Sequence, residues 1–329
     1  MKRKIKIRTD GSSEIGLGHL VRCISLANML VDYYEIKFVC KFIPDEIVKE
    51  FENSKFELVK IFHELEFFEA ICSDEIVVLD GYNFDFDYHI TVKERCFKLI
   101  CIDDMHEQKF NADLIINHAP GISKSDYNAA SNTKFALGLE FALLRPLFLK
   151  QAVIQRKIEK LNTVLICFGG ADEINLTKKV VQEIIHINHF EEIIVITGSA
   201  YKHLRDLENY IRNNERVTHI HHADEVEMLE SMLKADLAIV PASGILVEIL
   251  AVGCIPVSGY YIDNQLNIYN GYKKLNAIVD AGDLRNMDIK EIIKNINILN
   301  HKNIIDGKSG LRIVEMIKSL EYENSNISR

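Results

Sequence analysis

Short apolar runs alternate with amphipathic segments along the whole chain. The first strand-like run is residues 5–8, and apolar residues at spacings of four, three and four then predict a helix over residues 18–31. The other strands predicted in this half cover residues 36–42, 56–61, 75–80, 97–104 and 113–118. Several of these runs are apolar throughout and end in Asp or Asn, which is typical of a parallel sheet covered on both faces.

The pattern pauses at the polar stretch 151–162 and then begins again. The strands predicted in the second half lie within residues 163–172, 191–199, 216–222, 235–244 and 254–261. We therefore predict an α/β protein with domains at 1–150 and 151–329, each opening with a strand and a Gly-rich turn. We expect the helical residues after Gly282 to pack back on the first domain. Ligands of open α/β sheets bind outside the carboxyl ends of the strands, so polar residues there are the candidates for function.

Composition narrows the possible partners. The chain has 329 residues and a net charge of −9, with no long basic stretch, which argues against nucleic acid. No apolar run reaches the roughly 18 residues of a membrane span, and the basic start lacks the apolar run of a signal peptide. The seven cysteines are scattered without a CxxC pair, as in reduced cytoplasmic proteins. We expect a cytoplasmic monomer that binds neither membrane nor nucleic acid.

The stretch RTDGSSEIGLGHLVRC carries the most chemistry in the first half. Gly16 and Gly18 allow close approach of a ligand to the backbone, and the N-terminus of the following helix favours a phosphate or the charge on a departing phosphate. His19 at this helix start can serve as a neutral base, Asp10 can orient it or hold a hydroxyl, and Arg22 can meet an anion. The alternative is that His19 only packs the helix start. The glycines match neither the dinucleotide fingerprint nor a P-loop, which argues against a dehydrogenase or an NTPase.

The second half offers Gly-rich turns that suit a pyrophosphate. The turn at 167–172 contains Gly170, and Ser243 begins another strand-to-helix turn. Glu248, one turn into that helix, can accept hydrogen bonds from ribose hydroxyls. The alternatives are that the glycines only form a tight turn and that Glu248 is a solvated acid on the helix surface. His219, His221 and His222 are close in sequence, but no acid or cysteine at a recognised spacing completes a metal site.

The opening stretch resembles the start of the UDP-sugar hydrolases of pseudaminic acid synthesis. The family pattern R-x-D-x-S-x-x-I-G-x-G-H-x-x-R is matched at Arg8, Asp10, Ser12, Ile15, Gly16, Gly18, His19 and Arg22. The segments VVLDGYNF, LICIDD, DLIIN, FALLRPLF, CFGGAD and DNQ resemble further family segments in the same order. The resemblance covers roughly residues 3 to 280, and its C-terminal part is shared with the lipid-II-type N-acetylglucosaminyltransferases.

This resemblance implies a GT-B fold of two Rossmann-like domains facing across a cleft. It also implies metal-independent hydrolysis of UDP-2,4-diacetamido-2,4,6-trideoxy-β-L-altropyranose, with no cofactor and with His19 activating the water that attacks C1. The catalytic residues implied are His19, Asp10 and Tyr82. Those implied to bind sugar or phosphate are Arg8, Ser12, Ser13, Gly16, Gly18, Arg22 and Asn117. Those implied to bind UDP are Gly169, Gly170, Asp172, Gly198, Ser199, Ser243, Gly244, Glu248, Asn264 and Gln265.

Two other functions remain open from the sequence. A glycosyltransferase that uses a UDP-amino-sugar would share the fold and the UDP site, but it needs an acceptor surface, and the first half has no clear basic amphipathic helix. A protein that binds a nucleotide sugar without chemistry would not need Asp10, His19 and Tyr82. Acceptor-dependent release of UDP would indicate the transferase, and tight binding without turnover would indicate the binding protein.

Overall fold

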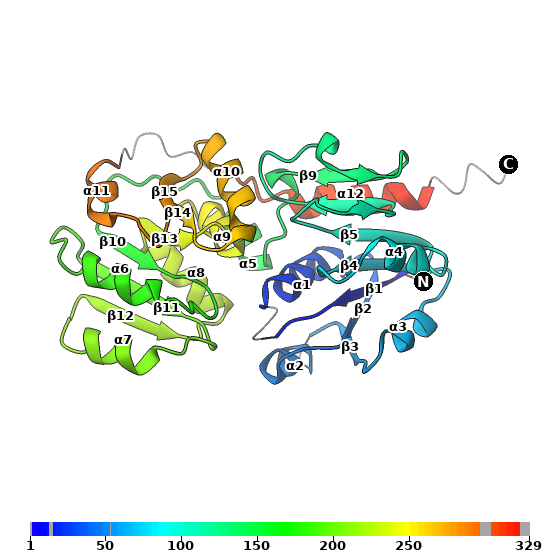
Figure 1. The fold of residues 1–329 in the computed structure, drawn as a ribbon, viewed down its shortest axis with the longest axis horizontal. Helices are drawn as coiled ribbons and strands as arrows, with labels where there is room; N and C mark the ends of the chain where they lie inside the picture. The colour runs from blue at the N-terminus through cyan, green and yellow to red at the C-terminus, as the bar shows by residue number, and fades with distance from the viewer. Residues whose placement is uncertain (1, 13–15, 53, 297–303, 323–329) are drawn as a thin grey trace. The chain divides into compact units, whose positions relative to one another are not determined.

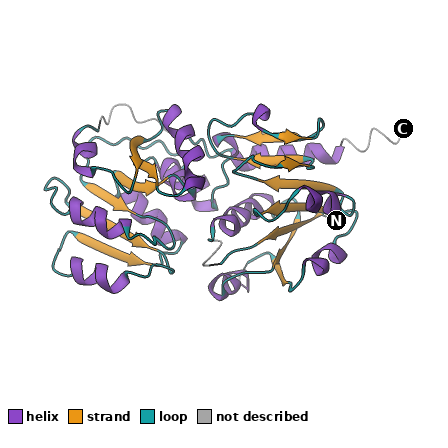
Figure 2. Cartoon of the chain, viewed as in Figure 1, coloured by secondary structure: helices purple, strands orange, loops and turns teal. Residues whose placement is uncertain are grey.

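The computed structural model describes residues 2–12, 16–52, 54–296 and 304–322. The chain divides into two compact units (Figure 1), of which the first contains Met1–Pro146 and Lys308–Arg329 and the second contains Leu147–Gly307. The polar stretch 151–162, where the sequence predicts the boundary, begins a few residues inside the second unit. Within each unit the strands lie between helices (Figure 2), as the apolar runs predict.

The first unit is built on a seven-stranded parallel sheet with the order β3-β2-β1-β4-β5-β7-β9. Its strands are β1 (Lys4–Thr9), β2 (Glu35–Cys40), β3 (Glu57–Lys60), β4 (Ile76–Asp80), β5 (Lys98–Ile102), β7 (Leu114–Asn117) and β9 (Lys134–Leu137). Its helices are α1 (Gly18–Leu30), α2 (Asp45–Glu52), α3 (Glu64–Ala70), α4 (Phe86–Lys93) and α12 (Ser309–Tyr322). A short parallel ladder joins β6 (Lys109–Phe110) to β8 (Asn128–Ala129).

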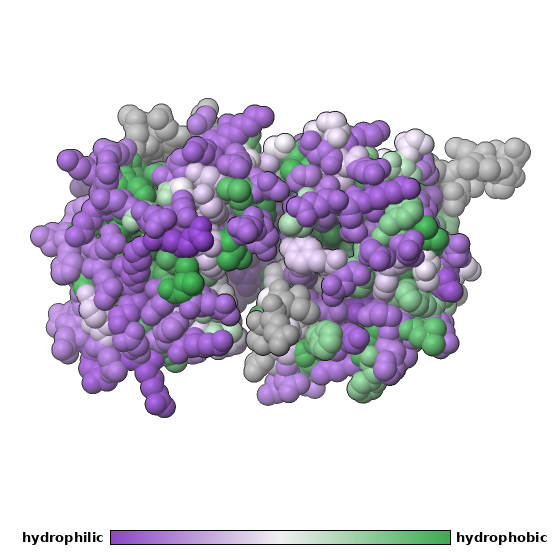
Figure 3. Space-filling model, in the orientation of Figure 1, coloured by the Kyte–Doolittle hydropathy of each residue, from purple (hydrophilic) through white to green (hydrophobic). Residues whose placement is uncertain are grey.

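Both faces of this sheet are buried, which explains why its strands are continuously apolar. In β4, Ile76 and Val78 join the core under α1 and α12, whereas Val77 and Leu79 join the core under α3 and α4. The face of the molecule seen in Figure 3 is mainly hydrophilic, with apolar side chains in small patches.

The last described helix belongs to the first unit. The core under α1 includes four residues of α12, namely Ile313, Val314, Ile317 and Leu320. Figure 1 shows this helix, in red, beside strands of the first unit. The chain therefore ends its described part in the unit in which it began.

The second unit repeats the design with a six-stranded parallel sheet in the order β12-β11-β10-β13-β14-β15. Its strands are β10 (Thr163–Ile166), β11 (Glu192–Thr197), β12 (Val217–His221), β13 (Leu237–Pro241), β14 (Ile255–Tyr260) and β15 (Val279–Asp283). Its helices are α5 (Pro146–Gln151), α6 (Leu176–Ile184), α7 (Leu204–Ile211), α8 (Glu225–Lys234), α9 (Gly244–Val252), α10 (Leu266–Lys274) and α11 (Ile289–Lys294). No helix in the described part of the chain is long and apolar enough to cross a membrane.

In each sheet, strands are added first on one side of the first strand and then on the other, so the strand order reverses at one place. In the first unit the order changes between β1 and β4, and in the second unit it changes between β10 and β13. Loops that leave the carboxyl ends of two such strands diverge and leave room for a ligand. The Gly-rich loops singled out in the sequence follow β1 and β10, so both of them lie at these switch points.

Candidate functional site

The switch point of the first unit brings the loop after β1 beside the loop after β4. Thr9 pairs with Asp80 across the two strands, so the residues that follow each strand are neighbours. Gly16 has a φ of +85°, which requires glycine, and its backbone pairs with that of Ser12. Leu17 at the N-cap of α1 supplies no side-chain hydrogen bond, so the first-turn N–H groups of α1 remain directed at the loop.

His19 is held by a buried carboxylate at the end of β4. Its Nδ1 lies 2.7 Å from Oδ1 of Asp80. Because a carboxylate oxygen can only accept, we assign a proton to Nδ1, and in the neutral imidazole this assignment leaves the lone pair on Nε2. We refer to these two residues as the His19–Asp80 pair. A neutral imidazole in this tautomer can act as a general base at Nε2.

Arg22, one turn further along α1, anchors this pair. It donates from Nη2 to Oδ1 of Asp80 over 2.6 Å and from Nε to Oδ2 over 2.7 Å. Its Nη1 donates to Oδ2 of Asp104 over 2.7 Å, and its Nη2 lies 3.0 Å from His19 Nδ1. Burial alone would raise the pKa of the Asp80 carboxyl, but the charge of Arg22 and the hydrogen bonds from Arg22 and His19 lower it to about 2. Asp80 is therefore ionised at neutral pH, and it fixes both partners.

Tyr82 completes the group around His19. The two rings meet edge to face, with centroids 4.6 Å apart and an interplanar angle of 82°. The Tyr82 hydroxyl donates to Oδ2 of Asp104 over 3.2 Å, while 54% of the residue is exposed. His19, Tyr82 and Arg22 are thus brought together as the sequence suggests, at one end of the first sheet.

Other residues assigned to the first site take part in internal hydrogen bonds. Arg8 is 1% exposed and forms a two-pronged pair with Glu64 of α3, over 2.7 and 3.2 Å. Asp10 accepts from Arg8 and from the backbone N–H groups of Lys41 and Phe42. Asn117 donates to the Tyr127 hydroxyl and accepts from a backbone N–H. In this structure these three side chains hold the loops, and contact with a substrate remains a prediction for each of them. Ser13 lies outside the described residues.

Asp80 is not among the residues that the sequence assigns to the site. From the segment VVLDGYNF, which contains Asp80, the resemblance implies a role for Tyr82 only. The available signal was an Asp at the end of a wholly apolar strand. An Asp in this position indicates a site residue only when the register of β1 and β4 is known, because that register places Asp80 beside the start of α1.

In the second unit the loops after β10, β11, β13 and β14 gather at the same edge of the sheet. Gly169 has a φ of +85°, and a Cβ on Gly198 would lie 2.5 Å from the Cα of Gly170, so the first two loops are in direct contact. The Tyr261 hydroxyl reaches the carbonyl of Phe168 over 3.5 Å, which links the β14 loop to them. Three of the predicted UDP-binding residues, Gly169, Gly170 and Gly198, are therefore brought together at this edge of the sheet.

The remaining predicted UDP-binding residues differ in how they are placed. Asp172 caps α6 by accepting from the N–H groups of Leu176 and Thr177. Ser243 is the N-cap of α9 without a side-chain cap bond, and Gly244 beside it is exposed. Those with buried side chains are Glu248 in α9 and Gln265, which accepts from the Tyr261 N–H. Those at the surface are Ser199 and Asn264.

The histidines near β12 have partners of their own. His219 Nε2 and His221 Nδ1 lie 2.9 and 3.1 Å from the Thr197 hydroxyl. Across the described ranges, no group of three or more His, Cys, Asp or Glu side chains is arranged to hold a metal ion.

Each unit has a parallel sheet between helices and a Gly-rich loop at its switch point. Two α/β units of this kind define a fold of the GT-B type. MurG of Acinetobacter baumannii has this fold, with a TM-score of 0.61 and 9% identity over 97% of this chain and 100% of that one. The UDP-GlcNAc 2-epimerase of Methanocaldococcus jannaschii gives a TM-score of 0.54 and 13% identity over 97% of this chain and 100% of that one. At these identities the likeness concerns the fold alone, and it confirms the predicted fold class.

Sequence comparison gives more specific relatives. The UDP-2,4-diacetamido-2,4,6-trideoxy-beta-L-altropyranose hydrolase of Campylobacter jejuni is 26% identical over 80% of this chain and 93% of its own length. The chain is a distant homologue of this hydrolase, which confirms the resemblance noted in the sequence. The spore coat polysaccharide biosynthesis protein SpsG of Bacillus subtilis is 21% identical over 97% of this chain and 98% of its own length.

A third relative is longer than this chain. The uncharacterized protein MJ1062 of Methanocaldococcus jannaschii is 27% identical over 96% of this chain, and the match spans 66% of the archaeal protein. No protein-family model matches the chain.

Proposed function

We propose that this protein is a nucleotide-sugar enzyme that hydrolyses UDP-2,4-diacetamido-2,4,6-trideoxy-β-L-altropyranose to UDP and the free sugar. The observation that carries the proposal is the His19–Asp80 pair, because its hydrogen bond leaves the Nε2 lone pair available for a water molecule. The homologous hydrolase of Campylobacter jejuni supports the choice of substrate.

In the proposed reaction, His19 Nε2 takes a proton from water as the water oxygen attacks C1 of the sugar. The bond between C1 and the β-phosphate oxygen breaks, and its electron pair leaves with UDP. The products are the free sugar, UDP and a proton held on His19, which then passes to solvent. Asp80 stabilises the imidazolium through Nδ1 and keeps its orientation, as a buried carboxylate does beside a catalytic histidine in hydrolases.

The second unit would bind the nucleotide. Backbone N–H groups at the Gly169–Gly170 turn and at the start of α9 suit a diphosphate, and they can stabilise the charge that develops on the β-phosphate. The buried Glu248 suits the ribose hydroxyls. In the first unit, Tyr82 and the open backbone of Gly16 and Gly18 would contact the sugar and its phosphate.

The test is acceptor-free turnover. Purified protein is incubated with the diacetamido UDP-sugar and a chelator, and the products are followed by NMR. We expect equimolar UDP and free sugar, with the first-formed anomer identifying the face that water attacks. Release of UDP only when an acceptor sugar or lipid is added would instead favour a glycosyltransferase, a function that the GT-B fold also supports. Tight binding with no turnover under any condition would contradict both.

A further inference from the structure

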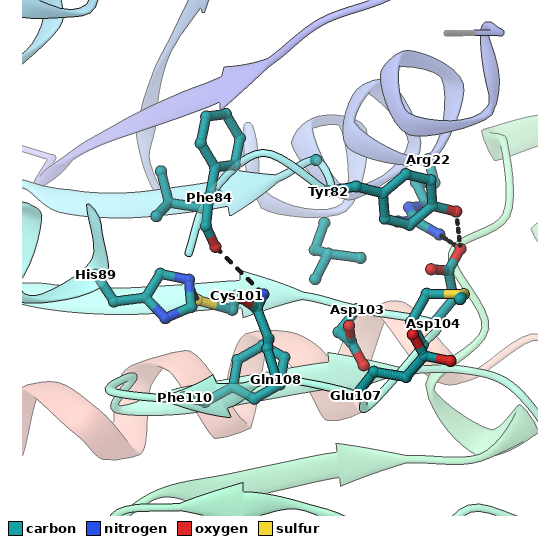
Figure 4. Close-up of a pocket in the computed structure, with 14 residues that line it drawn as sticks. Arg22, Tyr82, Phe84, His89, Cys101, Asp103, Asp104, Glu107, Gln108 and Phe110 are labelled. Atoms are coloured by element: carbon teal, nitrogen blue, oxygen red, sulfur yellow. Dashed lines mark hydrogen bonds and ion pairs between the residues drawn. The ribbon is translucent and has the colours of Figure 1, made fainter. Parts of the chain in front are cut away.

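A pocket of about 220 Å³ lies in the first unit at the carboxyl ends of β4 and β5, next to the His19–Asp80 pair. We call it the Tyr82 pocket (Figure 4). It is lined by Arg22, Leu79, Gly81, Tyr82, Phe84, His89, Cys101, Ile102, Asp103, Asp104, Met105, Glu107, Gln108 and Phe110. Tyr82 and Arg22 line it and also contact His19, so the pocket adjoins the proposed base. None of the functions discussed above uses this space.

The charge of the lining excludes an anionic occupant. Asp103, Asp104 and Glu107 line one end of the pocket (Figure 4), and the cation among its lining residues is Arg22. The Nε, Nη1 and Nη2 atoms of Arg22 already donate to the carboxylates of Asp80 and Asp104. Burial lowers the pKa of His89, at the other end, to about 4, so that ring is neutral at pH 7. A carboxylate or phosphate would therefore meet net negative charge in this pocket.

One acceptor in the lining lacks a donor. Oδ2 of Asp104 receives hydrogen bonds from Arg22 and Tyr82, as Figure 4 shows. Its Oδ1 is buried, and no group in the described part of the chain donates to it. Buried polar atoms normally have a partner, and a donor in the pocket can reach Oδ1 once a neighbouring side chain moves.

The rest of the lining is apolar. Leu79, Phe84 and Phe110 are each at most 5% exposed and line the pocket together with Cys101. At a share of roughly 30 Å³ per water, 220 Å³ equals about seven water molecules, which exceeds what an ammonium or hydroxyl group fills. An occupant must therefore combine a hydrogen-bond donor with an apolar end.

We propose that the Tyr82 pocket receives an acylamino substituent of the sugar. The amide N–H donates to Asp104, and the acyl methyl group lies against the apolar walls. This inference rests on the proposed function in one respect, because it takes the ligand of this unit to be a sugar. It assigns the specificity for an N-acylated sugar to the pocket between β4, β5 and α4, and not to the loop that precedes α1.

The test uses a matched pair of variants at Cys101, whose side chain is 2% exposed and lines the pocket. Cys101→Leu fills the pocket, whereas Cys101→Ser keeps its volume. Both are made in the His19→Gln protein so that the ligand persists. Saturation-transfer NMR then compares the acetamido methyl protons of the diacetamido UDP-sugar with its ribose protons. Two congeners, each with one acetamido group replaced by a neutral hydroxyl group, identify the group concerned.

We expect one acetamido methyl group to receive the strongest saturation in the Ser variant, and to lose it in the Leu variant while the ribose signals persist. In the proteins that keep His19, kcat/KM should favour the acylated sugar over one hydroxyl congener by roughly 10–200-fold, and Cys101→Leu should abolish that preference. Methyl signals no stronger than the ribose signals with Cys101 intact, or a preference retained by Cys101→Leu, would overturn the proposal. If the Leu variant does not fold, the comparison of congeners on the protein with Cys101 intact decides.

The two proposals fail differently. Because the NMR experiment measures binding, a saturated methyl group without hydrolysis contradicts the proposed hydrolysis and supports the Tyr82 pocket. Hydrolysis that is equally fast for the diacetamido sugar and both hydroxyl congeners supports the hydrolase and contradicts the pocket.

Discussion

Replacing Asp80 by Asn tests how the buried carboxylate supports both the fold and the proposed base. The side chain is fully buried and receives hydrogen bonds from His19, from two nitrogens of Arg22 and from the Cys23 thiol. Asn has nearly the same shape but no charge, and its amide nitrogen cannot accept. One of the three N–H donors of His19 and Arg22 then loses its acceptor, and Arg22 keeps a carboxylate partner only in Asp104.

The structure sets the size of both effects. Removing one partner of a buried ion pair costs about 3–5 kcal/mol, and because Arg22 retains Asp104 we expect the lower end, about 3 kcal/mol of unfolding free energy. The imidazole also loses the acceptor that fixes the Nδ1–H tautomer. General-base catalysis contributes roughly 10²–10⁴-fold, so kcat for UDP release should fall within that range.

Urea unfolding and UDP release are measured at a temperature where the variant is folded. The matched control is Asp113→Asn, since Asp113 is also buried, accepts from the Leu99 N–H and pairs with Lys93, but has no contact with His19 or Arg22. We expect the control to lose stability and to keep kcat within about twofold, because no catalytic group is moved. An Asp80→Asn enzyme with wild-type kcat would refute the role given to the His19–Asp80 pair.

Three further predictions concern the rest of the protein. Gly198→Ala would place a Cβ 2.5 Å from the Cα of Gly170. The loop must shift, and calorimetry should find UDP binding weakened by about tenfold or more, together with a loss of about 1–3 kcal/mol in stability. Glu248→Gln should weaken UDP binding by roughly 10–100-fold, because a hydrogen bond to a charged group contributes about 1.5–3 kcal/mol, and unchanged affinity would remove this residue from the nucleotide site. Burial lowers the pKa of His89 to about 4 from the ordinary value of about 6.5, so the unfolded chain binds more protons between these pH values. Stability should therefore be complete above pH 6.5 and fall by about 3 kcal/mol as the pH drops to 4, and urea unfolding of His89→Gln should show a flatter dependence.

The strands of the fold could be predicted from the sequence where both of their faces are buried. Strands β4 and β5 are apolar except for Asp80 and Lys98 because helices cover both sides of the sheet, so each strand can be recognised from its own sequence. Strand β9 was not predicted. Its four residues KFAL include one fully buried side chain, and a short edge strand of that kind has little periodicity.

Within the site, only the contacts between residues close in sequence could be predicted. His19 and Arg22 are three residues apart on one helix, so their proximity follows from helical spacing. The partner of His19 is 61 residues away, and the partner of Arg8 in α3 is 56 residues away. Both pairings depend on strand order and on which face of β1 a side chain occupies, and a residue pattern does not contain that information. The resemblance implies that Arg8 binds substrate, whereas its pair with Glu64 could not be predicted from the sequence.

The central claim is that the imidazole of His19 activates the attacking water, and the most direct measurement is the single-turnover rate of UDP release by His19→Gln. The account predicts a fall of roughly 10²–10⁴-fold with UDP affinity unchanged, because Gln keeps polarity at this position but cannot take a proton from water. A rate within a fewfold of the wild type, at equal UDP affinity, would contradict the account.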